Sequence, residues 1–76
     1  MSVSIKYCSV WNYLPKASSL ESYIRNKIKD IQVELISGGG GVFEVRFNKE
    51  LIFSKKSIGR FPENSEIVNL IIEKSN

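Results

Sequence analysis

The spacing of apolar residues changes twice in the first half of the chain, and this constrains the fold more than any other feature. Residues 2–7 alternate apolar and polar side chains, as does a strand with one buried face, and residues 31–36 do the same. Between these segments Pro15 suits the first turn of a helix. One apolar helix face then follows at spacings of three and four: Ala17, Leu20, Ile24, Ile28 and Ile31. A strand, a crossover helix and a strand predict a unit with parallel strands.

The second half of the chain predicts a hairpin followed by a helix. Residues 42–47 alternate again, and residues 51–53 can pair with them through a tight turn at Asn48 and Lys49, because Asn tolerates a positive φ. Residues 54–59 are interpreted as a polar loop. A second amphipathic helix is indicated by the last apolar group: Ile67, Val68, Ile71 and Ile72.

The predicted order of elements, βαβββα, indicates an α+β domain, an α/β sandwich in which two helices pack on one four-stranded mixed sheet. The minimal thioredoxin-like fold has this order, and other small α+β folds share parts of it. With 76 residues the chain has room for one domain, residues 1–76, and only for a shallow site. Its 42% of hydrophobic and 25% of charged residues are typical of a folded domain.

Charge and hydropathy give expectations about partners and location. The net charge of +3 is spread along the chain, which gives little reason to expect a nucleic-acid partner. No apolar run approaches the ~20 residues that span a bilayer, and the N-terminus lacks the pattern of a secretory signal. We therefore expect a cytoplasmic, monomeric protein that does not bind membranes.

The absence of histidine and the presence of a single cysteine remove most enzyme chemistries from this chain. A Ser-His-Asp or Cys-His arrangement is impossible, a zinc site lacks ligands, and no intrachain disulfide can form. We expect no metal and no bound cofactor. Whether the chain is an enzyme stays open at this point.

Cys8 is the side chain best placed to carry reactivity. It lies where the first strand ends and the chain turns toward the first helix. Main-chain N–H groups at a helix N-terminus and cations such as Lys6 or Lys16 favour the thiolate, which is the nucleophilic form. The alternative interpretation is that Cys8 is a small buried apolar residue at the end of a strand.

Trp11 stands three residues after Cys8, where a redox enzyme would place its second thiol. Tryptophan cannot form half of a disulfide, so the dithiol cycle of a C-x-x-C motif is impossible in this chain as written. The same loop is unusually apolar, which suits a hydrophobic lid or a partner-contact surface. Its other apolar residues are Val10, Tyr13 and Leu14.

The four glycines at residues 38–41 match neither common phosphate-binding pattern, because no G-K-[ST] follows and no G-x-G-x-x-G begins a helix. Glycines directly before a strand let backbone approach another segment closely. We therefore predict that this run packs beside Cys8 and Trp11, with a mobile connection as the alternative.

A small basic patch follows the predicted hairpin, formed by Lys55, Lys56 and Arg60 beside Phe61. A charge run of this size is usually a solvated loop. The alternative is a docking patch for an anionic peptide or for the carboxylates of glutathione.

Several segments together give the chain a resemblance to the selenoprotein W family of small, thioredoxin-like Rdx proteins, in particular to its short bacterial and algal members. The glycine run continuing into V-F-E-V and the block G-R-F-P are the specific parts, because neither follows from hydrophobic alternation. The similar segments are residues 5–8, 40–45, 51–55 and 59–62, with Tyr13, Pro15, Ala17 and Leu20 at the start of the helix.

The resemblance implies a thioredoxin-like βαβββα fold with a C-x-x-C or C-x-x-U motif, where U is selenocysteine. Cys8 falls on its first position and Trp11 on its second. The family is associated with thiol redox and glutathione-dependent antioxidant chemistry, so glutathione or partner-protein thiols are the implied partners. Because UGA encodes selenocysteine and is one base from the tryptophan codon UGG, Trp11 marks either a former or misread selenocysteine or a native one-cysteine member.

Two hypotheses of function result. In the first, Cys8 is a nucleophilic thiol that forms mixed disulfides, which glutathione or a partner thiol resolves. In the second, the chain is a non-catalytic binding module whose apolar loop around Trp11 contacts a partner, and Cys8 is incidental.

Overall fold

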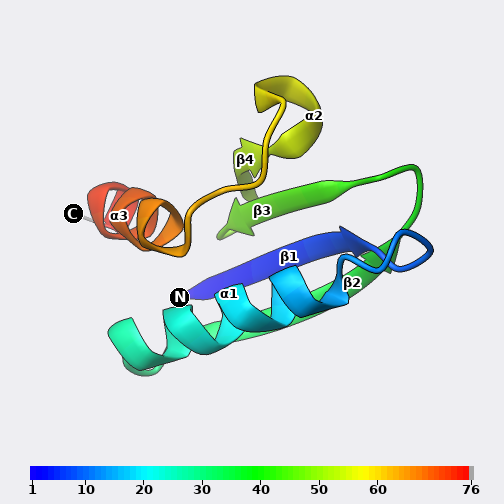
Figure 1. Ribbon diagram of the computed structural model, residues 1–76. Helices are drawn as coiled ribbons and strands as arrows, with labels where there is room; N and C mark the ends of the chain where they lie inside the picture. Colours follow the sequence, from blue (N-terminus) through cyan, green and yellow to red (C-terminus); the bar gives the residue numbers. More distant parts are fainter. Residues whose placement is uncertain (76) are drawn as a thin grey trace.

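The computed structural model describes residues 1–75 of the chain (Figure 1). The strands are β1 (Ser2–Cys8), β2 (Gln32–Gly38), β3 (Phe43–Phe47) and β4 (Glu50–Ser54), and the helices are α1 (Leu14–Lys27), α2 (Lys55–Ile58) and α3 (Asn64–Ser75). The four strands form one sheet in the order β2-β1-β3-β4. β1 pairs in parallel with β2 and antiparallel with β3, and β4 pairs antiparallel with β3. The predicted βαβββα order and four-stranded mixed sheet are confirmed.

Helices α1 and α3 contact each other and cover one face of the sheet, with the hydrophobic core between them and the strands (Figure 1). From α1 the core receives Ala17, Leu20 and Ile24, as their helical spacing predicts. The core residues of α3 are Ile67, Val68 and Ile71, whereas Ile72 is exposed. The predicted second amphipathic helix is confirmed, although Ile72, one of the four apolar residues that indicate it, lies outside the core.

The end of α1 differs from the sequence-based expectation. The helix ends at Lys27, and Ile28 has extended backbone angles while its N–H still donates to the carbonyl of Ile24. Ile31 is buried, but it lies outside both α1 and β2, which begins at Gln32. Its side chain reaches the core from the connection between α1 and β2. Apolar spacing alone could not show this, and it placed Ile31 both on the helix face and at the start of the strand.

The hairpin between β3 and β4 has the predicted turn. Asn48 and Lys49 have φ angles of 49° and 76°, in the left-handed region. The Asn48 N–H donates to the carbonyl of Ser2 at 2.9 Å, and the Ser2 N–H donates to Asn48 Oδ1 at 3.0 Å. The turn is thereby attached to the start of β1.

The segment after the hairpin was expected to be a polar loop, and this expectation is wrong. Residues Lys55–Ile58 form the short helix α2, which ends at Gly59 with φ of 90°. A glycine in the left-handed conformation is a common helix stop, because it carries no Cβ to clash. The structure therefore has one short helix in addition to the two that were predicted.

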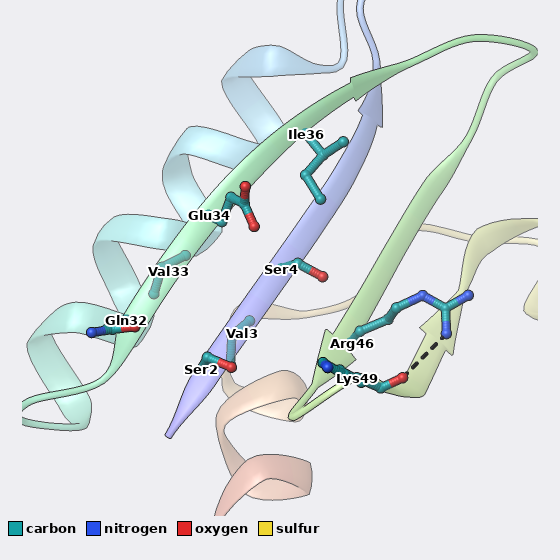
Figure 2. Close-up of a pocket in the computed structure, with 9 residues that line it drawn as sticks. All are labelled: Ser2, Val3, Ser4, Gln32, Val33, Glu34, Ile36, Arg46 and Lys49. Atoms are coloured by element: carbon teal, nitrogen blue, oxygen red, sulfur yellow. Dashed lines mark hydrogen bonds between the residues drawn. The ribbon is translucent and has the colours of Figure 1, made fainter.

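The other face of the sheet is not covered by a helix, and it carries polar side chains around a shallow hollow (Figure 2). The short side chains of Ser2 and Ser4 on β1 form its floor, between longer side chains such as Glu34 on β2 and Arg46 on β3. Arg46 is held there because its Nη1 donates to the carbonyl of Lys49 at 3.4 Å. The hollow lies at the opposite end of β1 from Cys8.

Candidate functional site

Cys8 is the last residue of β1, and the chain folds back over it at once. We call residues 8–13 the thiol loop. The Asn12 N–H donates to the carbonyl of Ser9 at 3.2 Å, and the Tyr13 N–H donates to the carbonyl of Cys8 at 3.0 Å. Asn12 has φ of 60°, a conformation that Asn adopts more readily than most residues. These turns bring the Trp11 N–H to 3.4 Å from Cys8 Sγ.

On its other side Cys8 contacts the segment that enters β3. We call residues 38–41 the glycine turn. The Cys8 N–H donates to the carbonyl of Val42 at 2.8 Å, and the Ser9 N–H donates to the carbonyl of Gly38 at 3.2 Å. The thiol of Cys8 is therefore enclosed between the thiol loop and the glycine turn.

Gly41 is the point of closest approach between these two segments. A Cβ added to Gly41 would lie 2.5 Å from Cζ3 of Trp11, and Gly41 also has φ of 74°. No other residue type fits there without a shift of the indole or of the main chain. The predicted packing of the glycine run beside Cys8 and Trp11 is confirmed.

Main-chain N–H groups determine the electrostatics of the thiol. Burial raises the pKa of Cys8, but hydrogen bonds from the N–H groups of Trp11, Gly41, Val10 and Val42 lower it, and the net result is a pKa below the usual thiol value. The sequence pointed to Lys6 and to the first turn of α1 as the cause. The shift instead comes from the main chain of the thiol loop and the glycine turn.

The thiol and its loop differ sharply in exposure. Cys8 is fully buried, with 0% of its surface accessible, whereas Val10, Trp11 and Leu14 are 82%, 59% and 45% exposed. Cys8 thus combines both sequence-based interpretations, because it is a buried small residue and also a thiol in contact with N–H donors. The apolar loop surface that the sequence predicted is present.

An aromatic ladder connects the thiol loop to the core. The ring of Trp11 lies 6.1 Å from that of Tyr13, Tyr13 lies 4.7 Å from Phe61, and Phe61 lies 5.3 Å from the buried Phe43, all edge to face. Such pairs stabilise a fold by about 0.5–1.5 kcal/mol each beyond their buried area. The ladder therefore holds Tyr13, at the end of the thiol loop, in one position.

The predicted basic patch divides into two parts with different roles. Arg60 makes a bidentate ion pair with Glu66, with both N···O distances at 2.9 Å, so its charge is compensated. Lys55 instead places Nζ 5.7 Å from the ring centre of Tyr13 and 5.3 Å from that of Phe61. Lys55 is therefore part of the surface beside the thiol loop. Arg60 instead links the segment before α3 to Glu66 in the first turn of that helix.

Sequence reasoning named Lys16 only as a cation that could act on the Cys8 thiol, and not as a neighbour of Phe61. Lys16 in α1 places Nζ 5.1 Å from the ring centre of Phe61, next to Lys55. No spacing pattern links residues 16, 55 and 61, because they come from three separate elements. Only the packing of α1 against the segment before α3 brings them together.

The described part of the chain offers no other reactive centre. Within residues 1–75 there is no group of His, Cys, Asp and Glu side chains that could hold a metal ion. None of the helices in this range is long and apolar enough to cross a membrane. The hollow on the uncovered sheet face contains no cysteine and lies away from the thiol.

A βαβββα domain with a cysteine at the end of its first strand, enclosed by two loops, belongs to the class of small thioredoxin-like domains. Within that class the chain is a member of the Rdx family, whose family model matches residues 2–73. The match covers almost the whole chain, so it includes the thiol loop, the glycine turn, α1 and most of α3.

Comparisons with solved structures and curated proteins agree with this assignment. The structure of a selenoprotein W-related protein from Vibrio cholerae superposes with a TM-score of 0.94 at 25% identity, covering 99% of this chain and 96% of that one. A protein from Bordetella parapertussis shares the fold with a TM-score of 0.92 at 24% identity, covering 96% and 95%. The bovine and mouse proteins named migration and invasion enhancer 1 are 30% identical over 74 residues, or 97% of this chain. The chain spans 64% of the length of these relatives.

Proposed function

We propose that this Rdx domain is a thiol-redox protein of the selenoprotein W type, with Cys8 as its nucleophile. The observation that supports this best is the Trp11 N–H, which donates to Sγ at 3.4 Å and, with the main-chain N–H groups of Val10, Gly41 and Val42, lowers the pKa of the thiol. These donors stabilise the thiolate in a site where burial alone would oppose it. A cysteine that served only as core packing would need no such donors.

The proposed reaction is thiol–disulfide exchange with a disulfide of a partner protein or of oxidised glutathione. The Cys8 thiolate attacks one sulfur, a new S–S bond to Cys8 forms, and the other sulfur leaves as a thiolate. A thiol from solution, such as glutathione, then attacks the mixed disulfide and releases Cys8. Because Trp11 occupies the second position of the motif, the resolving thiol comes from outside the chain.

Reaction at Cys8 requires the thiol loop to open. Sγ is buried, and the loop that covers it carries two strongly exposed apolar side chains, Val10 and Trp11. Local opening of such a segment needs less free energy than global unfolding. Opening moves Trp11 off Gly41 and exposes Sγ, while the N–H groups of Gly41 and Val42 remain in place on the other side.

The direct test uses 2,2′-dithiodipyridine, a small neutral disulfide, on the reduced protein. Attack by Cys8 releases pyridine-2-thione, which absorbs light, and mass spectrometry locates the adduct on the chain. We expect the rate to follow an apparent pKa below about 8.5, the value of a free thiol, and Cys8→Ser to abolish the reaction. A thiol that reacts only in denaturant, or with an apparent pKa of 8.5 or more, would rule out the redox function.

A second candidate function is supported by the contrast in exposure. Trp11 and Val10 stand in solvent while Cys8 is buried, which is the arrangement expected of a binding module that uses aromatic anchors. In that case a partner isolated with the protein would bind Cys8→Ser as tightly as the wild type, and Trp11→Ala would weaken it by about 2 kcal/mol. In the redox function, Cys8→Ser would instead abolish covalent capture of the partner.

A further inference from the structure

Lysine side chains lie on two sides of the thiol loop, and their charges are not compensated. Among residues 1–75 the ion pairs involve Arg25, Arg60 and Lys74, but none of the lysines beside the loop. Lys16 and Lys55 lie over the ring of Phe61, and Lys56 lies over the glycine turn, with Nζ 3.6 Å from the position of a Cβ on Gly40.

Two ammonium groups that approach the same ring repel each other. The ring of Phe61 attracts both Lys16 and Lys55, but it carries no net charge that could compensate them. The carboxylate of Glu66, close to Phe61 in sequence, is already engaged by Arg60. Glu63 lines the same shallow hollow as Lys16 but forms no ion pair with it in the described part of the chain. An added anion would relieve this repulsion.

The lysines adjoin an apolar surface that water solvates poorly. Trp11 contacts Gly41 at one side and stacks edge to face on Tyr13 at the other, so it lies between the glycine turn with Lys56 and the aromatic ladder with Lys55. A ligand that fits this surface has an apolar group for the loop and negative charges at both sides of it. An extended acidic peptide segment has this chemistry.

We propose that Val10, Trp11 and Leu14 together with Lys16, Lys55 and Lys56 form a docking surface for an acidic segment of a partner protein, whose disulfide is thereby presented to Cys8. The inference rests on the proposed function, since it names the substrate class of the same thiol. Apolar contacts with Trp11 hold the segment, and the lysines select carboxylates on either side of the partner cysteine. Exchange then forms a disulfide between Cys8 and the partner cysteine and releases the partner's other sulfur as a thiolate.

The test compares two peptides of equal length, each with one cysteine activated as its neutral 2-pyridyl disulfide. In one peptide a leucine and glutamates flank the cysteine, and in the other the glutamates are replaced by lysines. Release of pyridine-2-thione gives the second-order rate constants. We expect the acidic peptide to react faster by on the order of tenfold at low ionic strength, and salt to reduce the ratio.

Charge-reversal variants locate the effect. Lys55→Glu with Lys56→Glu should abolish or reverse the preference for the acidic peptide. Lys27→Glu with Lys29→Glu changes the net charge equally near the far end of α1 and should leave most of the preference intact. Thermal unfolding confirms that both double variants are folded.

Each outcome is decisive. If both peptides react at equal rates, or if both double variants reduce the preference equally, the docking surface does not exist. Oxidised glutathione reacting faster than the acidic peptide, with the same dependence on Lys55 and Lys56, would likewise overturn a partner-protein segment as occupant. Failure of 2,2′-dithiodipyridine to modify Cys8 would instead refute the underlying redox function.

Discussion

The two ends of β1 are both pinned by a turn, yet the two turns are built differently. At the start of β1, the hairpin turn uses Asn48 and Lys49 with positive φ angles and exchanges hydrogen bonds with Ser2. At the end of β1, the glycine turn has positive φ at Gly40 and Gly41, and an indole ring lies directly on it. The hairpin turn requires only a positive φ, which Asn and Lys can adopt. The glycine turn requires in addition that Gly41 carry no Cβ, because the indole of Trp11 occupies that space.

The difference extends to what each end exposes. The hairpin end exposes Leu51, which is 42% accessible, but no aromatic ring, whereas the thiol end leaves Val10 and the indole of Trp11 in solvent above a buried thiol. A connection that only reverses the chain has no need of such a surface. Trp11 remains 59% exposed, so the fold does not gain the free energy that burying the indole would provide. This exposed apolar surface is therefore an argument for function at this end of β1.

The largest effect is expected from Gly41→Val, which violates both requirements at the thiol end. A Cβ at 2.5 Å from the Trp11 ring, with φ of 74°, should lower the free energy of unfolding by about 2–3 kcal/mol. Displacement of the Gly41 and Val42 N–H groups should also raise the pKa of Cys8. Chemical denaturation and the pH profile of alkylation measure the two effects.

Two companion variants separate the contributions at Gly41. A Cβ on Gly39 meets no heavy atom within 4 Å, so Gly39→Ala should change stability by less than about 0.5 kcal/mol. Combining Gly41→Val with Trp11→Ala removes the clash but not the backbone strain, and should recover about 1 kcal/mol. If Gly41→Val is no worse than Gly39→Ala, the contact with Trp11 has no structural importance.

The next effect concerns the geometry of the thiol loop. The main-chain nitrogen of Trp11 lies 3.4 Å from Cys8 Sγ. We therefore expect the Cα atoms of residues 8 and 11 to lie within the roughly 4.4–6.8 Å that a disulfide requires, so that the two thiols of Trp11→Cys can be joined. Oxidised glutathione should then convert the two thiols to an internal disulfide and release two molecules of reduced glutathione. Mass spectrometry should find a loss of two hydrogens with the fold intact.

Trp11→Ala is the matched control, because it removes the indole without adding a thiol. It should form only a mixed disulfide with glutathione at Cys8. Two free thiols in Trp11→Cys after incubation with oxidised glutathione would mean that this loop cannot support the chemistry of a C-x-x-C motif.

A smaller effect follows from the lowered pKa of Cys8. A thiol whose pKa is lower in the folded state than in the unfolded state binds its proton less tightly when folded. Its contribution to stability is therefore absent below the folded pKa, grows as pH rises, and is complete above the unfolded value of about 8.5. The stability of the wild type relative to Cys8→Ser should rise between pH 6 and about pH 9, as measured by urea denaturation at each pH. A constant difference would show that the N–H groups do not act on the thiol.

The sequence was sufficient to predict the strands, the two long helices and the place of Cys8, because these depend on local periodicity and on chain order. It also predicted the close approach of the glycine run to Trp11, since a run of glycines before a strand has few other uses. It could not assign Ile31 to a connection, because a buried side chain reaching in from a turn has the same apolar character as one on a helix.

The electrostatics of the site were also beyond sequence reasoning. The N–H groups that lower the pKa of Cys8 belong to the main chain, which every residue has, so no residue type marks them. Likewise Lys16 and Lys55 meet only at Phe61, through packing of distant segments. The sequence therefore could not predict the features of the site that depend on tertiary structure and not on residue type.

The smallest effect is expected at the hairpin end, and it sharpens the comparison most directly. Asn48→Gly relieves the cost of a positive φ but removes the hydrogen bond from the Ser2 N–H to Asn48 Oδ1, so the two changes should cancel to within about 0.5 kcal/mol. The Ser2 N–H is exposed and can turn to water. Because this turn lies at the far end of β1, the reactivity and the apparent pKa of Cys8 should be unchanged. Urea denaturation and the alkylation profile check both. A variant that altered Cys8 as strongly as Gly41→Val does would mean that β1 transmits strain along its whole length, and that the two ends are not independent.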